Sequence, residues 1–132
     1  MVPQTANAVS GPMRVWLRLE NLSALMLAVF VYGRQHMAGH ALWLLFAGLF
    51  FAPDLAMLGY LAGARVGAML YNTMHSYILP LALTAFALLK NHGEVLPYAL
   101  IWIAHIGFDR SLGYGLKYDS GFGYTHLGWI GK

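Results

Sequence analysis

The chain has 132 residues, of which 59% are hydrophobic and 10% are charged, and its formal net charge is +3 at pH 7. Soluble domains carry roughly 25% charged and about 45–50% apolar residues, so this composition predicts an integral membrane protein. The positive charge is too small and too dispersed for a nucleic-acid-binding surface. The absence of cysteine excludes disulfides, iron–sulfur clusters and thiolate metal sites.

The chain divides into a short tail, a membrane domain and a second tail. Residues 1–13 are polar and lack the basic and apolar regions of a signal peptide, so a disordered N-terminal tail is expected. Residues 14–117 are expected to form a transmembrane domain of four apolar helices. The helices are predicted at about residues 15–32, 41–61, 65–90 and 95–116. Each is close to the roughly 20 residues that a helix needs to cross the hydrocarbon core.

Short loops between these segments make successive helices antiparallel, which predicts an all-α, four-helix up-down bundle. Arginines and lysines near the ends of the spans give its orientation. Six of them are expected on the side of both termini: Arg14, Arg18, Arg65, Arg110, Lys117 and Lys132. The other side has Arg34 and Lys90, so both termini are predicted to be cytoplasmic. We expect the bacterial inner membrane as the location.

Pro53 and Pro80 lie inside the second and third predicted spans. Each removes a backbone N–H donor and is expected to kink its helix. A kink can open a pocket or merely let neighbouring helices fit together, and both interpretations stay open.

The C-terminal tail, residues 118–132, is too rich in glycine and aromatic residues for a helix. One interpretation is a belt of aromatic side chains at the membrane interface. The other is a lid that folds back over the cytoplasmic mouth of the bundle and brings His126 with it.

The polar side chains inside the four segments are expected to lie at one depth. They are Glu20, Asn21, Asp54, Asn72, His75, His105 and Asp109. At a rise of about 1.5 Å per residue, the ionisable members and Asn72 lie roughly 9–17 Å from the cytoplasmic ends of their segments. Because charged groups cost several kcal/mol inside a bilayer, such a layer predicts a functional site.

Two pairs in this layer share helix faces, Asn72 with His75 and His105 with Asp109. Two histidines and several carboxylates that converge in a bundle indicate a metal site, and N and O ligands suit zinc, manganese or iron. The expected roles are His75, His105 and Asp109 as ligands, Asp54 as a fourth ligand or base, Glu20 as a base or supporting group, and Asn72, Arg110 and His126 as groups that hold substrate or orient ligands.

Other interpretations stay open. Buried polar residues also join membrane helices by hydrogen bonds worth around 0.6 kcal/mol each. The chain would then be a small non-catalytic subunit of a larger membrane complex, whose aromatic tail docks a partner. Haem held by His75 and His105 is a further alternative, but it leaves Asp54 and Asp109 without a role. The bilayer is a partner in every case, and a catalyst would work alone or as a homo-oligomer.

Several segments closely resemble a family of small bacterial membrane proteins known as domain of unknown function 4260. They are Arg18-Leu-Glu-Asn21, Pro53-Asp54-Leu-Ala-Met-Leu-Gly-Tyr60, Tyr71-Asn72 with His75, the run from Ala104 to Lys117, and Thr125-His126-Leu-Gly128. The resemblance covers about residues 18–131. It implies a membrane protein of that family and no particular activity.

A second, weaker resemblance is to the LexA-regulated, membrane-bound metal-dependent hydrolases. The similar elements are Pro53-Asp54, Met74-His75-Ser76, and His105 with Asp109 and Gly113. Ala56 stands where that family has a second aspartate, and Tyr71-Asn72-Thr73 where it has an arginine. This resemblance implies a metal-dependent hydrolase that acts on a lipid-like or amphipathic substrate from the cytoplasmic face.

Overall fold

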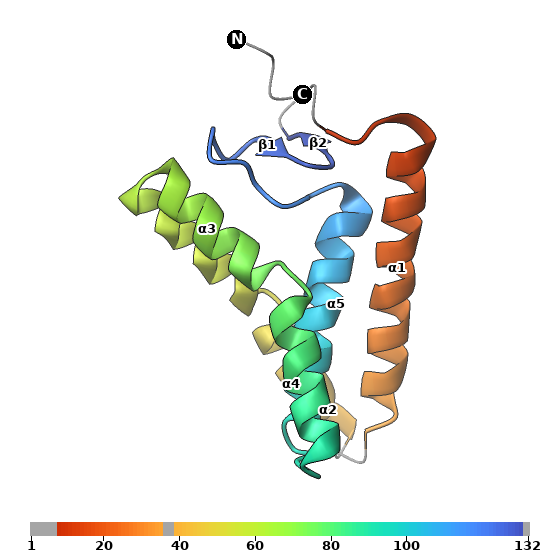
Figure 1. Cartoon of the computed structure of the whole chain (residues 1–132). Coiled ribbons are helices and arrows are strands. Elements are labelled where there is room, and N and C mark those ends of the chain that lie inside the picture. The colour runs from red at the N-terminus through yellow and green to blue at the C-terminus, as the bar shows by residue number, and fades with distance from the viewer. Residues whose placement is uncertain (1–7, 36–38, 131–132) are drawn as a thin grey trace.

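The computed structural model describes residues 8–35 and 39–130, and its regular structure is almost entirely helical (Figure 1). The helices are α1 (Gly11–Gly33), α2 (Gly39–Leu49), the 3-10 helix η2 (Ala52–Ala62), α3 (Ala64–Met74), α4 (Ile78–Leu89) and α5 (Leu96–Leu112). Two short strands, β1 (Tyr124–Thr125) and β2 (Gly128–Trp129), pair antiparallel. The predicted all-α class is confirmed, and the bounds lie close to those of the four predicted segments except at the start of α1 and the end of α5, each four residues from the predicted limit.

The second and third apolar segments each bend between two helical pieces. In Figure 1, η2 and α3 lean away from α5 as one arm, while α2 and α4 lie at the opposite end of the molecule. Pro53 and Pro80 each lie in the first turn of the piece that follows the bend. A proline in a first turn removes no intrahelical hydrogen bond, so the chain can restart its helix there. From these two bends onward the arm diverges from α5.

Helix α5 is the central element, since it contacts α1, α2 and α4 and carries the largest group of buried residues. Gly107 lies where α5 packs most closely against α1. A Cβ atom there would come within 2.8 Å of the Asn21 carbonyl oxygen and 2.9 Å of the Leu25 amide nitrogen. Small residues at such crossings let two membrane helices approach closely. The glycine therefore fixes the distance between α1 and the site-bearing helix.

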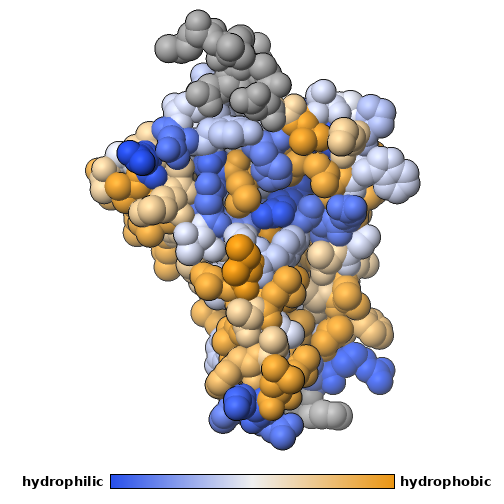
Figure 2. Space-filling model, viewed as in Figure 1, coloured by the Kyte–Doolittle hydropathy of each residue, from blue (hydrophilic) through white to orange (hydrophobic). Residues whose placement is uncertain are grey.

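Three helical stretches of the described residues are long and apolar enough to cross a membrane: Gly11–Gly33, Gly39–Ala62 and Ala64–Leu89. Their large apolar side chains are widely exposed, as at Leu44 (73%) and Leu89 (80%). Figure 2 shows hydrophobic residues covering most of the lower half of the molecule, with hydrophilic residues gathered above. This is the surface of a membrane protein. Helix α5, with 17 residues, spans about 25 Å and is the most enclosed.

Within the described residues, both tails contain regular secondary structure. Helix α1 already begins at Gly11, so positions 11–13 of the predicted N-terminal tail are helical, while positions 1–7 lie outside the described residues. The C-terminal tail forms the β1–β2 hairpin, and the Val9 N–H donates to the His126 carbonyl oxygen at 2.8 Å. The start of α1, the end of α5 and this hairpin lie together at one end (Figure 1).

Candidate metal centre

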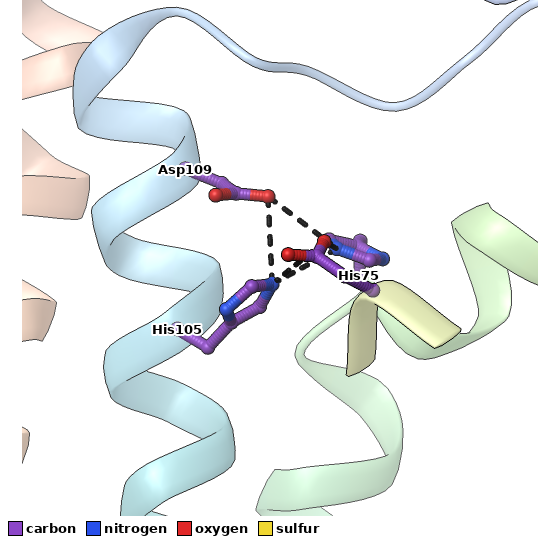
Figure 3. A group of neighbouring side chains, drawn as sticks. His75, His105 and Asp109 are labelled. Atoms are coloured by element: carbon purple, nitrogen blue, oxygen red, sulfur yellow. Dashed lines mark hydrogen bonds and ion pairs between the residues drawn. The ribbon is translucent and has the colours of Figure 1, made fainter. Parts of the chain in front are cut away.

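Four side chains converge where the arm meets α5: Asp54, His75, His105 and Asp109 (Figure 3). We call them the His/Asp cluster. Asp54 lies in the first turn of η2, and His75 directly follows α3. His105 and Asp109 stand one turn apart on α5. Because Asp54 and His75 lie at the base of the arm, where it meets α5, three separate helical elements bring their polar groups to one point.

Five of the six distances between the ligand atoms of the His/Asp cluster are close to the edge of a tetrahedral coordination sphere, and all four atoms lie within 4.8 Å of one another. The two histidine Nε2 atoms lie 3.1 Å apart. Asp54 Oδ1 lies 3.2 and 3.3 Å from the Nε2 atoms of His75 and His105, and Asp109 Oδ2 lies 3.4 and 3.5 Å from the same two atoms. Zinc–ligand bonds of about 2.0–2.1 Å place the corners of a tetrahedron roughly 3.3–3.4 Å apart. The donor set therefore fits one ion of that size.

A backbone hydrogen bond fixes the tautomer of His75. His75 Nδ1 lies 2.9 Å from the Tyr71 carbonyl oxygen. A carbonyl only accepts, so Nδ1 carries the ring proton and the Nε2 of neutral His75 is a lone pair. That lone pair faces two carboxylates and the His105 Nε2 atom, so it can accept a proton carried by one of these groups or bind a cation. A carbonyl that fixes the ring in this way is the usual companion of a metal-binding histidine.

Burial gives the His/Asp cluster a closed side and an open side. The side chains of His105 and His75 are 0% and 3% exposed, whereas those of Asp109 and Asp54 are 14% and 25% exposed. Phe50 closes the histidine side, with its ring edge-on to His105 at a centroid distance of 5.4 Å. Water or a substrate would therefore approach from the carboxylates.

The bend between α3 and α4 is held by donors from α5. The Arg110 guanidinium donates to the His75 carbonyl oxygen at 3.0 Å, and the Trp102 indole donates to the Met74 carbonyl oxygen at 2.6 Å. A helix end leaves carbonyl groups without partners, and these two bonds satisfy them. Arg110, which the sequence placed near the site, thus fixes the backbone that carries His75.

Not every predicted residue of the polar layer reaches the His/Asp cluster. Glu20 is exposed on α1 and is not among the clustered ligands. Its neighbour Asn21 is buried instead and accepts a hydrogen bond from the Tyr77 hydroxyl at 2.7 Å. The base role expected for Glu20 therefore has no geometric support, because the residue lies on a different face of α1 from the one that packs on α5.

Asn72 and His126 hold the C-terminal segment in place. The Asn72 side chain donates to the Lys117 carbonyl oxygen at 2.8 Å and accepts from the Lys117 N–H at 2.6 Å. His126 Nδ1 accepts from the Leu116 N–H at 2.9 Å. The sequence expected both residues to hold substrate or orient ligands. In the structure they fasten the segment after α5 to α3 and to the hairpin, beside the His/Asp cluster rather than in it.

Residues 14–130 match the model of a protein family described as a domain of unknown function, DUF4260. The chain belongs to this family. Neither a curated protein nor a solved structure matches it. The DUF4260 resemblance of the motifs is thus confirmed, while the similarity to the LexA-regulated hydrolases stays a prediction.

Two residues of this DUF4260 chain adjoin the cluster without having been assigned a role from the sequence. The Tyr71 ring stacks on His75 with a centroid distance of 3.7 Å, and its hydroxyl donates to Asp109 Oδ2 at 3.3 Å. Lys117 is 4% exposed, with Nζ 4.7 Å from the Tyr71 ring centroid and 3.8 Å from that of Phe122. The sequence could have indicated a role for Tyr71, because it lies four residues before His75 and therefore on the same helix face.

Replacing Tyr71 by phenylalanine is expected to weaken metal binding roughly tenfold, since the stacked ring remains but the bond to Asp109 is lost. The affinity for Zn²⁺ can be measured by competition with a chelator. Tyr98→Phe is the matched control, because Tyr98 is 49% exposed at the start of α5. Equal affinities for the two variants would contradict the role of the Tyr71 hydroxyl.

Burial lowers the pKa of the Lys117 ammonium from 10.5 to about 8, although Asp109 and Asp54 act in the opposite direction. Between pH 8 and 10.5 the unfolded chain thus binds a proton here that the folded chain has released. The contribution of Lys117 to the free energy of unfolding therefore rises as the pH increases through that window. We expect the unfolding midpoint of the wild type to rise from pH 8 to 10 relative to that of Lys117→Met. If the unfolding midpoints of the two proteins changed with pH in parallel, the expected contribution of Lys117 would be contradicted.

Proposed function

We propose that this DUF4260 protein is a four-span, up-down membrane bundle of the bacterial inner membrane, with both termini in the cytoplasm. Helix α5 would be the fourth span. The proposed orientation rests on the arginines and lysines gathered at the hairpin end, following the positive-inside rule. It places the His/Asp cluster in the cytoplasmic half of the membrane.

We further propose that the chain binds one divalent cation and acts as a metal-dependent hydrolase of a lipid-like substrate. The observation that carries this is the convergence of two imidazole nitrogens and two carboxylate oxygens within 4.8 Å of one another, open toward the carboxylates. Two N and two O donors without sulfur suit zinc, manganese or iron. When bound at such a site, the ion supplies an activated water near neutral pH and polarises the bond to be cleaved.

The division of labour follows from burial. His75, His105 and Asp109 are the three least exposed members of the His/Asp cluster and are proposed as the permanent ligands. Asp54 is the most exposed, at 25%, and comes from the arm rather than from α5. We propose that its carboxylate takes the proton of the attacking water and returns it to the leaving group. Lys117, buried nearby, would favour negative charge that develops on the substrate.

The test is ester hydrolysis by the purified protein in lipid nanodiscs, assayed with a phospholipid and with a p-nitrophenyl ester, after loading with Zn²⁺, Mn²⁺ or Fe²⁺. Asp54→Asn keeps the shape of the side chain but not its basicity, and we expect its turnover to fall by about 10²-fold or more. Glu94→Gln, exposed in the loop before α5, is the control. Lack of hydrolysis with all three metals, or equal turnover of Asp54→Asn and wild type, would contradict the proposal.

Two observations favour a second candidate, a non-catalytic subunit of a larger membrane complex. Four protein ligands around zinc are typical of structural sites, which leave no position for water. The tail also exposes aromatic side chains that a partner can cover, with Phe122 46% and Trp129 45% exposed. Native-gel size and co-purifying chains distinguish the two, because a catalyst should migrate alone or as a homo-oligomer and a subunit should travel with partners.

A further inference from the structure

We propose that the chain carries a binding site for an anionic phospholipid on the face of α5 opposite the His/Asp cluster, with one acyl chain in an apolar groove and the phosphate at Arg110 and Arg18. This site is independent of the proposed hydrolase activity. It rests on the groove, on the arginines at one end of it, and on the lack of acids to pair with them.

The groove lies between α1, α4 and α5 and has a volume of about 470 Å³. Its lining is almost entirely apolar and includes Ala24, Ala28, Tyr77, Leu88, Leu100 and Ile103. Along the third span it extends from Tyr77 to Leu88, which is about 16 Å at the helical rise. That is close to half of the roughly 30 Å hydrocarbon core, so the groove matches an acyl chain of one leaflet.

The groove and the His/Asp cluster occupy opposite faces of α5. Residues 96, 100 and 103 line the groove at helical spacing. His105 follows Ile103 by two positions, which is about 200° around a helix with 3.6 residues per turn. Arg110 follows Ile103 by seven positions and therefore returns to the groove face. The same helix thus presents metal ligands to the arm and an arginine whose guanidinium lies between the α3–α4 bend and the Tyr77 end of the groove.

The end of the groove at Tyr77 is polar and positively charged. The Tyr77 hydroxyl donates to Asn21, and the Arg110 guanidinium lies 4.9 Å from the Tyr77 ring centroid. One turn before Asn21 on α1, Arg18 donates through Nε to the Ser111 carbonyl oxygen at 2.7 Å, next to Arg110 in sequence. Figure 2 shows a band of hydrophilic residues directly above the hydrophobic lower half of the molecule.

These arginines lack anionic partners within the described residues. Arg18 and Arg110 contact two carbonyl oxygens and a tyrosine ring. Arg65, by contrast, forms an ion pair with Asp119. Guanidinium groups bind phosphate through paired N–H donors. A zwitterionic lipid would bring a third cation to a region that already holds two. The charges therefore favour a lipid whose headgroup is anionic overall.

The experiment is native mass spectrometry of the full chain in mild detergent, with phosphatidylglycerol or phosphatidylcholine added at equal concentration. We expect one phosphatidylglycerol per chain, bound more tightly than phosphatidylcholine. Arg18→Gln should weaken phosphatidylglycerol binding about fivefold, since one cation near the headgroup is worth about that factor. Arg65→Gln, on the exposed arm, should leave it unchanged.

A second pair of variants tests the groove itself. Ala28→Phe, at a position that is 3% exposed in the lining, should abolish retention of either lipid while the arginines remain. Ala24→Phe, at a half-buried position of the same lining, is the milder substitute if Ala28→Phe does not fold. Equal retention of the two lipids by the wild type, or undiminished phosphatidylglycerol binding in the folded groove variant, would overturn the proposal.

Discussion

Replacing His105 by alanine is expected to abolish stoichiometric metal binding while the protein remains folded. His105 is fully buried and its Nε2 lies within 3.5 Å of a ligand atom of each other member of the His/Asp cluster. Losing a group that merely orients a ligand already costs about 10–100-fold in metal affinity, so losing the ligand itself should cost more than roughly 100-fold. Without His105, the three remaining ligands would leave one side of the ion unbound.

The loss can be measured as a missing thermal shift. An ion at about 1,000 times its Kd stabilises the folded state by roughly 4 kcal/mol. Addition of Zn²⁺ should therefore raise the unfolding midpoint of the wild type and leave that of His105→Ala unchanged. His92→Ala is the matched control, because His92 is exposed in a loop and pairs with Glu94. An equal shift in wild type and His105→Ala would show that zinc binds elsewhere.

Replacing Gly107 by alanine is expected to destabilise the protein by about 1–3 kcal/mol, the usual penalty for overpacking a core. The added Cβ would meet backbone atoms of Asn21 and Leu25 on α1, and backbone cannot move aside as a flexible side chain can. Helix α1 must then shift away from α5. Because His105 and Asp109 flank Gly107, we also expect weaker metal binding in this variant.

Gly48→Ala provides the control for Gly107→Ala. Gly48 lies in α2, and a Cβ atom added there would have no neighbour within 4 Å. Alanine favours a helix by about 1 kcal/mol over glycine, so this variant should be unchanged or slightly more stable. Stability is measured by titrating a denaturing detergent into protein held in a mild one. Similar losses in both variants would contradict the close α1–α5 crossing.

The convergence of the His/Asp cluster could be predicted because depth along a helix follows from counting residues. Asp54, His75, His105 and Asp109 were all placed at one level in this way, and the structure brings all four together. Counting residues gives the depth of a side chain along its helix but not the face of the helix on which it lies. Glu20 lies at the same depth as the His/Asp cluster but on another face of α1. The inward face of α1 carries its buried residues Asn21, Ala28 and Tyr32.

The bends and the tail could be predicted only in part. The prolines indicated that the second and third spans would kink, but not that η2 and α3 would lean away together, because that depends on packing between the two pieces. Helix α5 ends four residues before the predicted limit of 116, since Gly113 adopts a φ of 99° that favours glycine. The burial of Lys117 depends on Phe122, which only the folded tail brings over it.

The most direct test of the metal centre is elemental analysis of protein purified in mild detergent without added metal or chelator. We expect close to one zinc, manganese or iron ion per wild-type chain, and less than a tenth of that in Asp109→Asn, which keeps the shape of the side chain but lacks its charge. Metal-free wild-type protein that also binds none when Zn²⁺, Mn²⁺ or Fe²⁺ is supplied would contradict the assignment of the His/Asp cluster as a metal site.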